Sequence, residues 1–397
     1  MDSDCCRGSA FIAHLDLEIL AELNSRYHLA FGCRRAYHDQ VFALTQHFNF
    51  FDGHNDVLTR LLDLPVGSAV DAFVKGDGQG HIDLPRMQSA NMTGGLFAMY
   101  VSSPSDDALD FSQLNGESYE VPLPTELPVE TALPVVLRQA GLLHRFVAHS
   151  SGHMKLCCSA SDIKQTMKEG SVAAVMHLEG AEAIDDELLN LDMLYKLGLR
   201  SLGPVWSRPT KFAHGVPFKY PGSPDTGPGL TELGEALIAR CNELNILIDL
   251  SHINEKGFWD IAKLSSAPLI ATHSNVHKLC PTTRNLTDDQ LRAIKDSDGM
   301  VGVNLATAFL REDGQMRSDT DIGLVCRHMD YLIDILGEDR VGLGSDFDGA
   351  VVPESIGSVS GLPVLATAMQ NHGYTQELMH KLCCDNWINA LHRVWGE

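Results

Sequence analysis

The sequence predicts an α/β fold, specifically a (β/α)8 barrel, and two observations support this prediction. First, from Phe48 onward short β-prone apolar runs alternate with amphipathic helical stretches, which is typical of βαβ units and a parallel sheet. Second, there are eight such runs, and eight strands with helical crossovers close most naturally into a barrel. We therefore predict one barrel domain over residues 46–397.

Each candidate strand is an apolar run of six or seven residues. The eight runs are Phe48–His54, Leu96–Val101, Val172–Leu178, Arg200–Trp206, Ile246–Ser251, Pro268–His273, Met300–Leu305 and Arg340–Ser345. The helices expected between them are Leu133–Ala148, Glu187–Leu197, Thr231–Leu244, Lys256–Leu264, Asp288–Lys295 and Ile322–Leu336.

Three further segments depart from this alternation. Ser102–Pro134 and Ser207–Gly229 are long and rich in turn-forming residues, so we expect loops over the C-terminal end of the barrel. Thr375–Trp395 predicts one or two closing helices. Residues 1–45 differ in pattern, and we expect an N-terminal helical extension there.

Composition excludes several classes of partner. Lys and Arg total 30 against 52 Asp and Glu, a net charge of −22 that argues against nucleic acid and anionic membranes. The ten cysteines show no C-x-x-C spacing, which suits reduced thiols. The N-terminus does not have the pattern of a signal peptide, and no apolar stretch reaches the ~18 residues of a membrane span. We expect a soluble, cytoplasmic protein.

Five of the eight strands end in residue types that bind metals, and in a barrel these ends meet at one mouth. A lone buried His is more often a hydrogen-bonded core residue than a ligand, but five coincidences at one rim make that interpretation untenable for the group. His54 and Asp56 are two residues apart, so on an extended strand both side chains point to the same side. The residues concerned are His54, Asp56, Glu179, His252, His273 and Asp346.

Three imidazoles with two or three carboxylates and no thiolate suit zinc, and less well manganese or iron. Five ligands exceed the three protein ligands of a mononuclear catalytic zinc. Two ions ~3.5–4 Å apart, bridged by a carboxylate and a hydroxide, fit the count better. The sequence therefore predicts two Zn²⁺ ions per chain.

These residues lie in motifs that resemble the zinc dipeptidases of the renal or membrane dipeptidase type. The likeness runs from about Phe48 to Val394, with the motifs in the family's order. The shared motifs are Asp52-Gly53-His54-Asn55-Asp56, Leu178-Glu179-Gly180, Asp249-Leu250-Ser251-His252, Thr272-His273-Ser274, Arg284-Asn285 and Gly344-Ser345-Asp346-Phe347-Asp348-Gly349.

The resemblance implies a role for each matching residue. His54 and Asp56 would hold one zinc, His252 and His273 the other, and Glu179 would bridge both. Asp346 matches the family's acid/base carboxylate beside the bridging hydroxide, and Arg284 matches the residue that pairs with the free carboxylate of the substrate. Hydroxide attack on the scissile carbonyl of a dipeptide follows as the implied reaction.

The sequence departs from the family's pattern at two positions. Trp206 stands where mammalian relatives carry a His that helps to bind the substrate carbonyl, and Trp cannot take a positive charge. Carbonyl polarisation would then depend on the metals or on His214, and Trp206 either binds substrate or packs at the rim. Phe309 stands where mammalian relatives carry a Tyr. Two further residues remain open: His177 is expected to support the site from outside the ligand set, and Asp348 either does the same or shapes a loop.

We therefore predict a metallodipeptidase that acts on small dipeptides, with L-Xaa-D-Xaa dipeptides as a reasonable substrate class. The alternatives are an amidohydrolase acting on N-acyl-amino acids or another small amide, and, less favoured, a non-catalytic metal-stabilised barrel. The resemblance also implies a possible homodimer.

Overall fold

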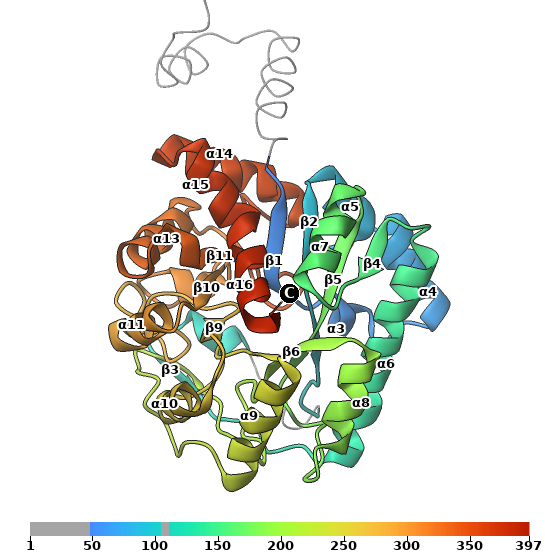
Figure 1. The fold of residues 1–397 in the computed structure, drawn as a ribbon. Coiled ribbons are helices and arrows are strands. Elements are labelled where there is room, and N and C mark those ends of the chain that lie inside the picture. The colour runs from blue at the N-terminus through green and yellow to red at the C-terminus, as the bar shows by residue number, and fades with distance from the viewer. Residues whose placement is uncertain (1–47, 105–110, 397) are drawn as a thin grey trace, which may run out of the picture. The chain divides into compact units, whose positions relative to one another are not determined.

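The computed structural model describes residues 48–104 and 111–396, and these contain the predicted barrel (Figure 1). Neighbouring strands follow the order β8-β6-β5-β2-β1-β11-β10-β9, and a parallel bridge between Asp249 and Ile270 joins the two ends. The (β/α)8 fold predicted from the alternation is confirmed. The eight strands are β1 (Phe50–Asn55), β2 (Met92–Tyr100), β5 (Val172–Glu179), β6 (Leu199–Gly203), β8 (Leu247–Ile248), β9 (Ile270–Ala271), β10 (Met300–Asn304) and β11 (Val341–Gly344).

The predicted strands all overlap the observed ones, although several end earlier. β6 ends at Gly203 rather than Trp206, because Pro204 has no N–H to continue the ladder. Trp206 therefore lies in the loop that follows the strand. The short β8 and β9 leave His252 and His273 in the turns beyond the strand ends.

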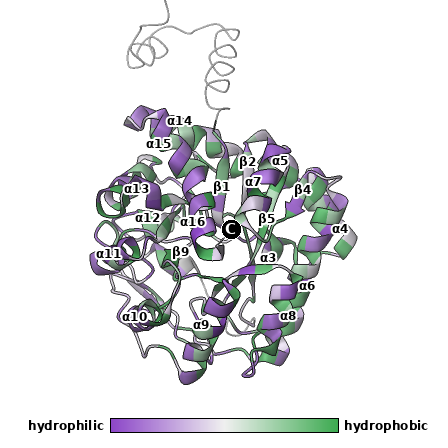
Figure 2. Ribbon diagram, in the orientation of Figure 1, coloured by the Kyte–Doolittle hydropathy of each residue, from purple (hydrophilic) through white to green (hydrophobic). Residues whose placement is uncertain are grey.

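Helices surround the strands, and Figure 2 shows hydrophobic and hydrophilic residues alternating along many of them. The six predicted helices are present as α6 (Val129–His149), α8 (Leu189–Leu197), α9 (Glu232–Leu244), α10 (Glu255–Leu264), α11 (Asp288–Asp296) and α13 (Gly323–Leu336). Within the part of the chain that the structure describes, the prediction missed ten further helices, most of them short. They are α3 (Val57–Leu61), α4 (Val66–Asp71), η1 (Ala72–Gly76), α5 (Leu84–Ser89), η2 (Phe111–Asn115), α7 (Ala160–Lys168), α12 (Thr307–Leu310), η3 (Glu338–Arg340), η4 (Val359–Gly361) and α14 (Leu362–His372).

The C-terminal helices close one end of the barrel. α15 (Gln376–His380), η5 (Lys381–Asp385) and α16 (Asn386–Trp395) cover the predicted segment, and α16 crosses the centre of the ring in Figure 1. Trp387 is fully buried and its Nε1 donates to the Leu343 carbonyl at 2.7 Å. A Cβ at Gly53 would overlap the Trp387 ring, so this position requires glycine.

The two long inserts are not loops alone, which corrects the prediction. β3 (Tyr119–Val121) in the first insert pairs antiparallel with β7 (Phe218–Tyr220) in the second. Each strand has three residues, too short to show an alternating pattern in the sequence. A further short strand, β4 (Met154–Leu156), extends the ladder beside β5.

The predicted N-terminal helical extension, residues 1–45, lies outside the described residues. Over the described ranges, no helix has the length and apolar character needed to cross a membrane. The seven cysteines in these ranges are all free thiols.

Candidate active site

Strand β1 brings His54 and Asp56 to the C-terminal mouth of the barrel. The His54 ring is fully buried, and its Nε2 lies 3.2 Å from Asp56 Oδ2. Asp52 fixes this end of β1, because its carboxylate accepts hydrogen bonds from Ser345 N at 2.6 Å and Ser345 Oγ at 2.8 Å. The first candidate ligand pair, His54 and Asp56, is thus tied to the end of the neighbouring strand β11.

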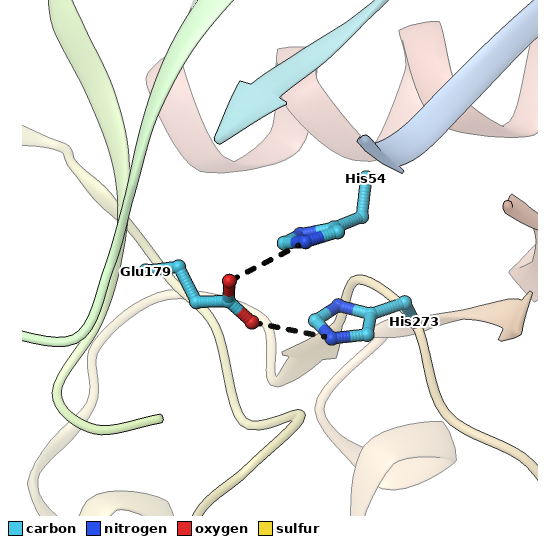
Figure 3. Close-up of side chains that lie close together, drawn as sticks. All are labelled: His54, Glu179 and His273. Atoms are coloured by element: carbon cyan, nitrogen blue, oxygen red, sulfur yellow. Dashed lines mark ion pairs between the residues drawn. The ribbon is translucent and has the colours of Figure 1, made fainter. Parts of the chain in front are cut away.

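Glu179, the last residue of β5, lies between the histidines. Its Oε2 is 3.6 Å from His54 Nε2, and its Oε1 is 3.1 Å from His252 Nε2 and 3.6 Å from His273 Nε2. Figure 3 shows one oxygen directed at His54 and the other at His273. One oxygen of the Glu179 carboxylate therefore faces His54, and the other faces a second set of imidazoles, His252 and His273.

The second set presents nitrogen lone pairs. The Nε2 atoms of His252 and His273 are 3.1 Å apart, and the Nδ1 atom of His273 lies 2.8 Å from Thr272 Oγ1. Thr272 donates its own hydroxyl proton to Asp249 Oδ2 at 2.6 Å, so it accepts from His273 Nδ1–H. This tautomer leaves His273 Nε2 unprotonated, as a metal ligand must be. Ser207 Oγ lies 2.9 Å from His252 Nδ1, within hydrogen-bond distance, and so helps to orient that ring.

The electrostatics of the site favour a bound cation. Burial lowers the pKa of His54, but Glu179, Asp56 and Asp346 act more strongly in the opposite direction and raise it to about 10. Burial raises the pKa of Glu179 well above its ordinary value. Buried carboxylates gathered around one imidazole need positive charge, which a divalent ion supplies.

The other half of the site is neutral. Burial lowers the pKa values of His252 and His273 well below the ordinary range, so both rings are uncharged at neutral pH. Two groups of three residues each place their possible ligand atoms within 4.8 Å of one another. The groups are His54–Glu179–His273 and His54–Asp56–Asp346. The all-N/O donor set, its spacing and its charge fit a metal centre.

Asp346 follows β11 in the left-handed region, with φ 59°. Its backbone N donates to the His54 carbonyl at 3.1 Å, and its Oδ2 accepts from Asn304 Nδ2 at 2.9 Å. Burial raises the pKa of Asp346 above its ordinary value. The predicted acid/base residue is therefore beside His54 and held from two directions.

Arg284 is buried next to the second histidine pair. Its guanidinium donates to the Ser251 carbonyl and, at 3.1 Å, to the His273 carbonyl, while its Nε has no partner among the described residues. The Cζ atom lies 5.3 Å from the centre of the Phe309 ring. Burial lowers the pKa of Arg284 to about 10, which leaves it charged at neutral pH.

A cavity of about 260 Å³ opens onto part of this site. One wall carries ligand-type side chains, and the other is mainly apolar. Among the described residues that line the cavity there is no Lys or Arg, so Arg284 stands behind the wall, beside Phe309. The metal-site wall consists of Asp56, Glu179, His252 and Asp346, and the other wall of Tyr100, Leu114, Trp206, Phe218, Ala306, Phe309 and Met316, among others.

The remaining predicted residues take three positions. Trp206 both lines the cavity and packs, with its ring 4.9 Å from that of Tyr100, whereas His214 is not on the cavity wall. His177 is buried outside the ligand set, with Nδ1 2.8 Å from Ser201 Oγ and its ring 5.4 Å from that of His54. Asp348 lines the rim and pairs with Arg60, with Oδ2 3.1 Å from Nε.

A family model for the membrane dipeptidases, peptidase family M19, matches residues 38–397. The chain belongs to peptidase family M19. The predicted family and enzyme class, a metallodipeptidase, are confirmed, and the match of this M19 peptidase to the family model extends over nearly the whole chain.

Solved M19 structures are similar over almost their full length. A structure described as the dipeptidase AC, a metallopeptidase of this family, is 53% identical with a TM-score of 0.86, covering 88% of this chain and 99% of that one. A metallopeptidase from Rhodobacter sphaeroides, liganded with a phosphinate mimic of the dipeptide L-Ala-D-Ala, gives the same values. An uncharacterized Klebsiella pneumoniae protein encoded in the pqqA 5′ region is 49% identical over 67% of this chain and 98% of its own.

Sequence reasoning missed three supporting residues of this M19 peptidase. Asp52 and Asp249 belong to the motifs quoted above, but no role was predicted for them. In the structure the carboxylate of each accepts a hydrogen bond from a Ser or Thr hydroxyl next to a candidate ligand. Asn304 was overlooked because the search for strand ends considered only His, Asp and Glu. Since Asn304 ends β10, the same search extended to amides would have found it.

Proposed function

We propose that this M19 peptidase is a binuclear zinc dipeptidase that hydrolyses dipeptides with a free C-terminal carboxylate, including those with a D-residue in the second position. The position of Glu179 is the observation that carries the proposal. A carboxylate that bridges two ions needs one oxygen for each, and its two oxygens face His54 and the His252–His273 pair separately. The phosphinate mimic of L-Ala-D-Ala bound by the 53% identical relative supports the substrate class.

Each ion would have its own ligands. His54 and Asp56 would hold one zinc, His252 and His273 the other, and Glu179 both. When bound, the two ions supply an acidified water and a Lewis acid for the peptide carbonyl. The chain's own contribution is to keep His273 in the ligating tautomer through Thr272 and to orient His252 through Ser207.

Asp346 would move the proton. Since its Oδ2 is engaged by Asn304, the free Oδ1 would take the proton of the attacking water and pass it to the leaving amine. The raised pKa of Asp346 suits this exchange, because a proton acceptor with a very low pKa would not hold the proton long enough to deliver it.

Arg284 and Trp206 would bind the substrate. Arg284 is a cation behind the cavity wall, and its Nε, which has no partner among the described residues, could donate to a carboxylate. Trp206 supplies part of the apolar wall against which the substrate packs. With Arg284 at one end and the metal ligands at the other, the site would measure the length of a dipeptide.

The test is release of amino acids from L,L-dipeptides, L,D-dipeptides and N-acyl-amino acids by zinc-loaded enzyme, with bound zinc counted by mass spectrometry. We expect two zincs per chain and cleavage of dipeptides. Asp346→Asn should lower kcat by about 10²-fold or more while both zincs remain bound. Asp186→Asn, which changes an exposed carboxylate paired with Lys211, is the matched control.

Other outcomes would redirect the proposal. Turnover of N-acyl-amino acids alone would make the chain an amidohydrolase with the same metal site. One bound zinc would contradict the binuclear assignment. No turnover with two zincs bound would leave a non-catalytic metal-stabilised barrel.

A further inference from the structure

Tyr100 lies beside the bridging carboxylate but has no part in the function proposed so far. It is the last residue of β2, and in the parallel ladder its Cα pairs with that of Glu179 on β5. Side chains of residues paired in register lie on the same face of a sheet. Tyr100 therefore points into the barrel mouth together with Glu179, and its side chain lines the cavity.

The Tyr100 ring is held in place while its hydroxyl is left available. Its backbone carbonyl accepts from Gln139 Nε2 at 2.9 Å, and its ring packs on that of Trp206 at 4.9 Å. The hydroxyl makes no hydrogen bond to any residue that the structure describes. A fixed phenol with an uncommitted O–H at a cavity wall is a donor positioned for a ligand.

The chemistry proposed for the cavity would be assisted by such a donor. Peptide hydrolysis places negative charge on the carbonyl oxygen, and donors aimed at that oxygen supply much of the rate enhancement. The acidic groups on the wall can only accept hydrogen bonds when ionised, and no Lys or Arg of the described chain lines the cavity. Apart from His252, which is a proposed metal ligand, the side-chain donors that do are Thr59, Tyr100, Ser102, Ser103 and Trp206. Of these, only Tyr100 pairs in register with Glu179.

We infer that the Tyr100 hydroxyl donates a hydrogen bond to the scissile carbonyl oxygen of the substrate, and that this bond strengthens as the oxygen becomes negative. Tyr100 is then a catalytic residue that contacts the reacting atoms. Burial, the largest influence on this phenol, raises its pKa, so it keeps its proton throughout the working range of pH. The inference rests on the proposed dipeptidase function.

The test compares Tyr100→Phe with wild-type holoenzyme on two probes: L-Ala-D-Ala as substrate and its phosphinate mimic as inhibitor. The variant keeps the ring that packs on Trp206 and loses only the donor. We expect kcat/KM to fall about 10²-fold, as for other oxyanion donors. The dissociation constant of the phosphinate, whose oxygens resemble the tetrahedral intermediate, should rise by a similar factor, while KM changes less than about threefold.

A matched control and a competing variant keep the test specific. Tyr331→Phe removes a hydroxyl that bonds to Asp288 between α13 and α11, far from the site, and should leave both readouts unchanged. If Trp206→Phe reproduces both losses and Tyr100→Phe does not, the donor is the indole and the inference is overturned.

The remaining outcomes are equally decisive. A lower kcat with unchanged phosphinate affinity, or loss of zinc from Tyr100→Phe, would assign the residue a structural role and overturn the inference. Wild-type enzyme that hydrolyses dipeptides no faster than Tyr100→Phe would overturn the inference alone. Wild-type enzyme that hydrolyses none would overturn the proposed function with it.

Discussion

The side-chain amide of Asn304 donates to Oδ2 of Asp346 across 2.9 Å. The amide is itself oriented, because its Oδ1 accepts from Ala306 N at 2.6 Å. Strand β10 thus fixes which oxygen of Asp346 is occupied and which is free to accept a proton.

Removing this donor should slow the chemical step and spare the metals. We expect Asn304→Ala to lower kcat about tenfold, because a hydrogen bond to a charged group contributes ~1.5–3 kcal/mol. The check is kcat on L-Ala-D-Ala together with zinc content. Full activity would show that Asp346 needs no orientation, and loss of zinc would show that Asn304 supports the ligands instead.

Arg284 should determine whether the enzyme requires a free carboxylate. We expect Arg284→Lys to reduce about tenfold the preference for L-Ala-D-Ala over its C-terminal amide, since Lys keeps the charge and loses the fork. The ratio of the two kcat/KM values is the readout. If Arg284 only supports the backbone carbonyls that it contacts, the substitution would lower both kcat/KM values equally. An unchanged ratio would therefore contradict a role for Arg284 in binding the carboxylate.

Chelation should destabilise the fold as well as abolish activity. Without cations the buried carboxylates around His54 lose their counter-charge, and ions that bind only the folded state stabilise it by ~4 kcal/mol at a thousandfold excess over Kd. We expect a lower Tm after metal removal, restored by two equivalents of zinc. An unchanged Tm would mean that the carboxylates are compensated without metal.

A histidine remote from the metal ligands should make stability depend on pH. Burial lowers the pKa of His328 from 6.5 to about 4, and its ring bonds to Val276 N and the Leu310 carbonyl. A group with a lower pKa in the folded state takes up its proton mainly on unfolding. Its stabilising contribution is therefore complete above pH 6.5 and is lost as the pH falls from 6.5 towards 4.

His328→Gln should reveal this contribution. Between pH 7 and pH 5 we expect wild type to lose ~2 kcal/mol more unfolding free energy than the variant, because one pKa unit corresponds to ~1.4 kcal/mol. Urea unfolding at the two pH values measures the difference. Equal losses in both proteins would exclude His328 as the titrating group.

That the candidate ligand residues lie close together could be predicted because a barrel gathers the ends of all its strands. His54, Glu179 and His273 are far apart in sequence, yet the rule that strands end at one mouth brings them together without knowledge of any side-chain contact. The strand assignment itself succeeded because buried parallel strands are apolar throughout.

Other features depend on contacts that no local pattern contains. The pairing of β3 with β7 joins three-residue segments about a hundred residues apart. The position of Arg284 behind Phe309 depends on how the segment after β9 packs against helix α12. The hydrogen bonds that link His273 to Asp249 through the Thr272 hydroxyl depend on side-chain rotamers. The spacing of residues in the sequence does not determine these rotamers.

The packing of the Trp387 indole against Gly53 means that the candidate metal ligands are synthesised before the helix that supports β1. During synthesis every proposed metal ligand has been made by residue 273 and the proposed acid/base residue by 346, yet the floor on which β1 rests is still open. That floor is filled only when the last helix docks and its Trp387 ring reaches Gly53, the neighbour of His54. A nascent or truncated chain can therefore hold the full set of ligands without the support that keeps the first of them in position.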